Sequence, residues 1–304
     1  MVNSPGLKHV KIEKSAVSRY AKELVVQFGG AGKNTSVFTS VGDGGAVDWD
    51  ASGIHYCEDV ASLGPMTVQY ICVLSALNFC FWPKPGFEYD TLAFSLKMVL
   101  EKDKEAFNAC KLANITPETV ASWFPSDNPI PNLLERVDRL REIGSVLEAD
   151  FGGSAANLVA TAKNSAVALV KLILMHFSGF RDTVVHEGRL VHFYKRAQIM
   201  TADIWGAYGR PRGDESNPYC FRDIDQLTMF ADYRVPQILR HVGILKYSEE
   251  LARMIDSEQV NGHSVTITHN THYTHYTHYA HYTHYTLYTH YAGDSVWKCS
   301  RDRD

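Results

Sequence analysis

The sequence of 304 residues predicts a mainly α-helical protein with a few short strands. From Pro65 onward, apolar residues recur at the spacing of helices that bury one face, and residues typical of helix starts and ends separate these segments. Runs that alternate β-branched and polar residues, as strands do, are scarce. We therefore expect a single helical domain at residues 65–260, preceded by a region at 1–64 and followed by a low-complexity tail at 261–304.

The composition is that of an ordinary globular protein, which we expect to find in the cytoplasm. Hydrophobic residues make up 45% of the chain, enough to form a core. The net charge of −4 predicts no positive field that would hold a long nucleic acid. Six cysteines without CxxC spacing are typical of reduced thiols. The apolar run 166–177 is too short for a membrane span, so we expect neither a membrane nor a stable nucleic-acid partner, and the oligomeric state stays open.

The region before residue 65 contains a glycine-rich stretch that resembles a phosphate-binding loop at first sight. In a Walker A loop, glycine stands five residues before the Gly-Lys pair and Ser or Thr follows it. Here Gln27 and Asn34 occupy those positions. We expect residues 29–45 to form a flexible connection, with a phosphate loop as the less favoured interpretation.

Helix boundaries are predicted in order along the domain. Asp90 is the expected N-cap of the first long segment, and Thr116 is the expected N-cap of another, with Pro117 at its first helical position. Leucine and valine spacing predicts a helix from Leu133 that ends at Gly152. The run 166–177 is apolar on nearly all sides, which predicts a central helix.

Lys195 and Asp203 lie in "KRAQIMTADIW", eight residues apart. In a helix they would lie about two turns apart and roughly on one face. A lysine and an aspartate at this spacing are usually a solvated or structural pair. A role in binding or catalysis is the alternative.

Asp232 lies in the aromatic segment "FADYRVPQ" between Phe230 and Tyr233. Pro236 predicts a turn at Asp232 that leads into a following helix at 236–245, "PQILRHVGIL". Asp232 is then an N-cap, or a local partner of Arg234, stabilised by the helix dipole. The alternative is a carboxylate that stabilises a developing positive charge beside aromatic rings. The residues alone leave these two interpretations balanced.

Asn78 lies among aromatic residues in "ALNFCFWPKPGF", where Phe79, Phe81 and Trp82 surround it. An amide beside aromatic rings suits hydrogen bonding to the edge of a stacked heterocycle. Aromatic clusters are nevertheless most often part of the core, and the core is the better prediction for Trp82.

The tail repeats Thr-His-Tyr between Thr268 and Tyr291. A three-residue period matches neither an α-helix nor a strand, so the tract has no face that could pack a core. We expect it to be disordered and to originate from an expanded or frame-shifted nucleotide repeat. A histidine-rich metal binder is the alternative, formed by His269, His272, His275, His278, His281, His284 and His290.

Four stretches together resemble the queuosine 5′-phosphate N-glycosylase family of queuosine salvage proteins. The resemblance extends in order over residues 70–260, and "FADYRVPQ" is its most specific motif. The stretches are "LNFCFW" at 77–82, "SAVALVKLILMHFSGFRD" at 165–182, "KRAQIMTADIW" at 195–205 and "DIDQLTMFADYRVPQILRHVGILKYSEEL" at 223–251.

The resemblance implies a helical fold similar to helix-hairpin-helix DNA glycosylases. It also implies hydrolysis of queuosine 5′-phosphate to queuine for tRNA modification, with no metal or organic cofactor. Asp232 matches the active-site aspartate that supports a ribosyl cation. The substrate-binding residues that we expect beside it are Asn78, Phe79, Lys195, Asp203, Phe230 and Tyr233.

Two departures from the family pattern affect this expectation. Ser75 stands where we expect an acidic residue in relatives, and the Thr-His-Tyr tract replaces ordered sequence after Val260. We therefore expect an impaired activity. The rivals are a DNA-base glycosylase, against which the negative net charge argues, and a catalytically impaired queuine-binding protein.

Overall fold

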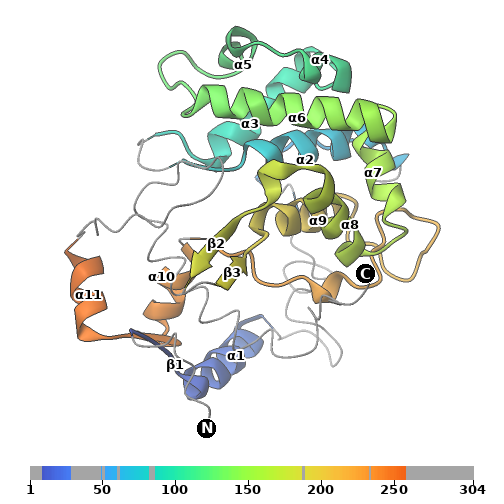
Figure 1. Cartoon of the computed structure of the whole chain (residues 1–304). Coiled ribbons are helices and arrows are strands. Elements are labelled where there is room, and N and C mark those ends of the chain that lie inside the picture. Colours follow the sequence, from blue (N-terminus) through green and yellow to red (C-terminus); the bar gives the residue numbers. More distant parts are fainter. Residues whose placement is uncertain are drawn as a thin grey trace, which may run out of the picture. The chain divides into compact units, whose positions relative to one another are not determined.

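The computed structural model describes most of the chain as two compact units. The larger helical unit comprises Asp48–Asp182 and Tyr194–Phe230, and the smaller unit comprises the remaining segments. Helices predominate in both, which confirms the mainly α-helical prediction (Figure 1). The described residues are 9–28, 49, 52–59, 62–81, 86–186, 189–232 and 234–257.

The helical unit is built around α2 (Pro65–Leu77), which is buried along almost its whole length. Its sequence "PMTVQYICVLSAL" has no charged residue, so it suits a helix that is covered on all sides. It packs against four other helices of this unit (Figure 1). The other helices are α3 (Tyr89–Lys102), α4 (Ala109–Ala113), α5 (Pro117–Ser122), α6 (Leu133–Phe151), α7 (Ala155–Thr161), α8 (Ala166–His176), α9 (Lys195–Ala207) and the 3₁₀ turns η2 (Ser178–Phe180) and η3 (Ile224–Gln226).

Several helix boundaries agree with the prediction. The Thr116 hydroxyl accepts a hydrogen bond from the Thr119 N–H at 3.2 Å and caps α5. The helix predicted from Leu133 ends at Gly152, whose φ of 57° is the left-handed conformation of a C-cap.

Two predictions for the helices need correction. Asp90 is not an N-cap, because α3 begins at Tyr89 and Asp90 lies inside its first turn. There the carboxylate still faces the positive end of the helix dipole. The run predicted as a central helix forms α8, but it is buried on one face only, since Met175 near its end is 62% exposed.

Gly144 allows α6 to approach α4 closely. A Cβ atom at Gly144 would lie 2.2 Å from the Ala113 nitrogen and 2.5 Å from the Ala109 carbonyl oxygen. Both neighbours are backbone atoms and cannot rotate away.

We expect Gly144→Ala to lower the free energy of unfolding by about 1–3 kcal/mol, because the two helices must move apart. Ser145→Ala is a matched control on the same helix, since Ser145 is exposed and alanine favours helix. Urea denaturation of both variants measures the difference. Equal stability of the two variants would contradict the close helix contact.

The smaller unit contains two short antiparallel sheets (Figure 1). In one, β1 pairs with β4 so that Lys11 faces Lys246. In the other, β2 and β3 form a hairpin. The elements are β1 (Val10–Ile12), α1 (Lys14–Phe28), β2 (Thr183–His186), β3 (Arg189–His192), α10 (Arg234–His241), β4 (Leu245–Tyr247) and α11 (Glu249–Asp256).

The helix predicted after Asp232 differs from the observed one at both ends. It begins at Arg234, so Pro236 is its third residue. Proline is tolerated in the first turn because its missing N–H has no partner within the helix there. The helix ends at His241, and Leu245 belongs to β4.

Some predictions fall outside the described residues. These are the connection at 29–45, Trp82, Tyr233 and the Thr-His-Tyr tract. Across the described part of the chain, every helix is too short or too polar to cross a membrane.

Candidate functional site

The helix α9 carries two of the predicted site residues, Lys195 and Asp203, as the spacing predicted. It starts after Tyr194, which has a left-handed φ of 53°. The carboxylate of Asp182 accepts a hydrogen bond from the Lys195 backbone N–H at 2.9 Å. This contact fixes the start of α9 and therefore the position of Lys195.

Asp182 is a polar residue that the sequence did not single out as functional. Burial raises the pKa of its carboxyl to about 6, against the opposing effect of the Lys195 N–H and the Arg196 charge. Its Oδ1 is buried and has no hydrogen-bond partner among the described residues. The only available signal was its position at the end of "SGFRD", and aspartates in loops are too common to be selected by that alone.

Asp203 lies two turns further along α9. The indole Nε1 of Trp49 donates a hydrogen bond to its Oδ1 at 3.2 Å. The protein packed around the carboxyl raises its pKa to about 7, although the indole N–H lowers it. Asp203 therefore changes its charge near neutral pH and is a candidate for a functional carboxylate.

Trp49 is itself held by an aromatic platform. Its ring stacks on His55 with 4.3 Å between ring centroids, and His55 Nε2 lies 2.9 Å from the Tyr89 hydroxyl. Burial, followed by the negative charge of Asp203, raises the pKa of Tyr89. Sequence reasoning missed Trp49 and His55, because they lie before residues 70–260, over which the resemblance extends.

The end of α2 lies beside the start of α9. Arg196 donates to the Ala76 carbonyl at 2.9 Å, and its guanidinium lies 5.0 Å from the centre of the Phe79 ring. The guanidinium of Arg136 lies 4.4 Å from the same ring. Phe79 is only 4% exposed, so the structure gives its ring a packing role between two cations. Asn78, the C-cap of α2, is partly exposed.

Ser75, which stands where relatives are expected to be acidic, is buried inside α2. Its hydroxyl has no hydrogen-bond partner within the described part of the chain. The position therefore lies in the interior of the helical unit.

Phe230 is connected to α9 through Thr228. Both the backbone N–H and the hydroxyl of Thr228 donate to Gln198 Oε1, at 2.8 and 2.9 Å. Gln198 lies one turn after Lys195. Phe230 itself is partly buried, two residues beyond this anchor.

Asp232 caps α10. Its Oδ1 accepts hydrogen bonds from the backbone N–H groups of Arg234 at 2.8 Å and Val235 at 3.0 Å. The predicted N-cap is thereby confirmed. Capping does not exclude catalysis, because it holds the carboxylate in one orientation at the positive end of a helix. Asp232 belongs to the smaller unit, whereas Asn78, Phe79, Lys195, Asp203 and Phe230 belong to the helical unit.

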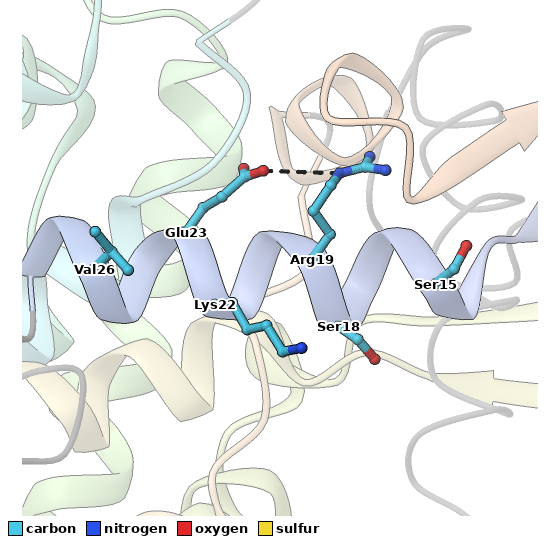
Figure 2. A pocket seen from close by; sticks show the side chains of 6 residues that line it. All are labelled: Ser15, Ser18, Arg19, Lys22, Glu23 and Val26. Atoms are coloured by element: carbon cyan, nitrogen blue, oxygen red, sulfur yellow. Dashed lines mark ion pairs between the residues drawn. The ribbon is translucent and has the colours of Figure 1, made fainter.

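A surface hollow on α1 is unrelated to these residues (Figure 2). A single helix supplies all of its lining, and the lining contains an ion pair of 3.8 Å between Arg19 and Glu23. Val26 in this lining is 82% exposed, so the hollow is open to solvent. The lining residues are Ser15, Ser18, Arg19, Lys22, Glu23 and Val26.

Within the described ranges, no three His, Cys, Asp or Glu side chains lie close enough together to hold a metal ion. The histidines of the tail lie outside these ranges.

Comparison with known proteins gives a consistent match. Residues 58–267 match the family model described as "Queuosine salvage protein". A relative from Dictyostelium discoideum is 45% identical over 216 residues, which cover 69% of this chain and 65% of the relative. One from Sphaerobacter thermophilus is 45% identical over 193 residues, which cover 60% of this chain and 58% of the relative. One from Mus musculus is 37% identical over 212 residues, which cover 65% of this chain and 60% of the relative.

All three relatives are named queuosine 5′-phosphate N-glycosylase/hydrolase. The chain spans less than two thirds of the length of each. The matched family segment contains α9 and Asp232, whereas Trp49 and His55 precede it.

Proposed function

Because this chain belongs to the queuosine salvage protein family, we propose that it hydrolyses the N-glycosidic bond of queuosine 5′-phosphate and releases queuine. The observation that carries this proposal is the 45% identity to a relative of that name over 216 residues. The family segment includes Lys195, Asp203 and Asp232, which supports assigning the reaction to them.

Asp232 is the proposed catalytic carboxylate. As the bond between C1′ and the base nitrogen breaks, its electron pair leaves with the base and positive charge develops on the ribose. A fixed carboxylate interacts more strongly with this transition state than with the uncharged ring, which is the condition for catalysis. The hydrogen bonds from Arg234 and Val235 fix its orientation. Asp232 then orients or deprotonates the water that attacks C1′, and the proton that this water loses ends on the departing base nitrogen.

The residues of α9 are proposed to bind the substrate. Lys195 pairs with the 5′-phosphate or with a carboxylate. The ionised carboxylate of Asp203 accepts hydrogen bonds from N–H groups on the edge of the deazaguanine base. Asn78 contributes a further contact to that edge, and Phe230 and Tyr233 contact the flat face of the base. Phe79 supports this region through packing, because its ring is buried between two guanidinium groups.

Incubation with queuosine 5′-phosphate tests the proposal. We expect queuine and ribose 5-phosphate to appear in equal amounts, which chromatography with mass detection measures. The nucleoside queuosine and a DNA duplex with a damaged base serve as alternative substrates. Base release from DNA alone would favour the DNA glycosylase, and tight queuine binding without ribose 5-phosphate would favour a binding protein.

A further inference from the structure

Asp203 receives a contact from a residue far away in the sequence. The indole N–H of Trp49 donates a hydrogen bond to the Asp203 carboxylate at 3.2 Å, although the two residues are 154 positions apart in the sequence. A hydrogen bond from a donor stabilises the ionised form of a carboxylate and restricts its orientation.

The position of Trp49 is restricted on two sides. On one side, its ring stacks on His55 with 26° between the ring planes, and His55 contacts the Tyr89 hydroxyl of α3. On the other side, it lies against Gly206 on α9, where a Cβ atom would come within 3.1 Å of the indole Cδ1. The indole thus has little space in which to turn away from Asp203.

We propose that Trp49 is a positioning residue for Asp203, and that the stacked His55 ring holds Trp49 in place. Through this contact, Trp49 sets the orientation and the charge of the carboxylate that meets the base edge. The inference rests on the proposed function, since it gives Asp203 the role stated there. Trp49 and His55 lie before residue 58, so the family match does not include them.

Among the described residues, the titratable groups around the cluster include His55, Tyr89 and Asp90. Tyr89 lies near Asp203, and Asp90 follows Tyr89 in the first turn of α3. Both carboxylates act on Tyr89 in the same direction and raise its pKa. Since the pKa of Asp203 is about 7, the fraction of ionised Asp203 rises as the pH rises through neutrality. If the ionised form binds the base, kcat/KM rises over the same range.

Trp49→Phe is the main test, because phenylalanine keeps an aromatic ring that can stack on His55 and removes the indole N–H. Loss of this donor disfavours the ionised carboxylate, so we expect the rising limb of the pH profile to move to higher pH by about one unit. At pH 7, KM should increase roughly fivefold for such a shift, with kcat little changed.

Trp205→Phe is the matched control, since Trp205 lies on α9, the helix that carries Asp203. The Trp205 indole donates at 3.2 Å to the Pro211 carbonyl oxygen, which does not titrate. The pH profile of this variant should coincide with that of the unmodified chain. A coincident profile for Trp49→Phe as well would overturn the inference.

A readout that does not depend on activity uses the indole N–H resonance of Trp49. The chain has five tryptophans, and the resonance missing from the Trp49→Phe spectrum belongs to Trp49. We expect this resonance to shift with pH with a midpoint near 7, and to lose the shift in Asp203→Asn. His55→Phe should keep the midpoint, which separates Asp203 from the histidine. Absence of the titration in the unmodified chain would also overturn the inference.

A failure of the substrate role proposed for Asp203 can be distinguished from a failure of the positioning role proposed for Trp49. If the Trp49 resonance titrates but Asp203→Asn keeps the full kcat/KM, the substrate role of Asp203 is wrong. The positioning role of Trp49 is then wrong as well. If Asp203→Asn loses kcat/KM while Trp49→Phe does not, the proposed function stands and only the positioning role is wrong.

Discussion

Asp232→Asn is expected to lower kcat by about 10²–10³-fold, the usual loss when one group that stabilises transition-state charge is removed. Asparagine has nearly the same volume and retains an oxygen that can accept the hydrogen bonds of Arg234 and Val235. It is also as good an N-cap as aspartate. The start of α10 should therefore stay in place while the negative charge is lost. Initial rates of queuine release, together with queuine affinity by calorimetry, measure the effect, and affinity should change little.

Asp223→Asn is the matched control for this substitution. Asp223 accepts hydrogen bonds from the Ala166 N–H at 2.6 Å and the Ser165 hydroxyl at 2.7 Å, so it too caps a helix. Removing its charge should leave kcat nearly unchanged. A near-normal rate for Asp232→Asn would show that its carboxylate only caps α10, the alternative that the residues alone left open.

Arg136→Met is expected to lower the free energy of unfolding by about 3–4 kcal/mol, because several buried carbonyl groups lose their donor together. Arg136 is completely buried and donates to the carbonyl oxygens of Pro131, Leu77, Phe79 and Cys80. Methionine fills much of the volume but donates nothing. Arg136→Lys should recover only part of the loss, since an ammonium group cannot form the planar fork of hydrogen bonds.

Arg141→Met is the control on the same helix. Arg141 is exposed and donates to one carbonyl, that of Ile115, at 2.9 Å. We expect a loss of about 1 kcal/mol or less, measured by urea denaturation alongside Arg136→Met. Equal losses for the two variants would contradict the role of Arg136. Because Arg136 holds the turn that contains Asn78, Arg136→Met should also raise KM in the protein that remains folded.

Local features of the sequence determined much of the secondary structure. The Thr116 cap, the end of α6 at Gly152 and the cap by Asp232 all depend on residues within a few positions of one another. Such short-range hydrogen bonds follow from residue type and spacing, so they can be predicted without the fold. The same holds for Lys195 and Asp203, whose spacing on α9 is a property of the helix itself.

Where local rules allowed two answers, the predicted helix boundary was wrong. Asp90 is a good N-cap residue, yet α3 starts one residue before it. Pro236 stops a helix in its interior but is tolerated in a first turn, and α10 includes it there. Tertiary packing selects among these alternatives, because their free energies differ by about 1 kcal/mol or less.

Only the tertiary structure decided the surroundings of the site residues. Phe79 was expected to bind the substrate, and the structure shows that Arg136 and Arg196 reach its ring from distant helices. The pKa of Asp203 near 7 arises from burial, and its hydrogen bond comes from Trp49, 154 positions away. Burial and long-range contacts depend on how the whole chain packs, so they cannot be predicted from the spacing of residues within α9. The sequence therefore determined which side chains are proposed for the chemistry, and the fold decided their charge and their partners.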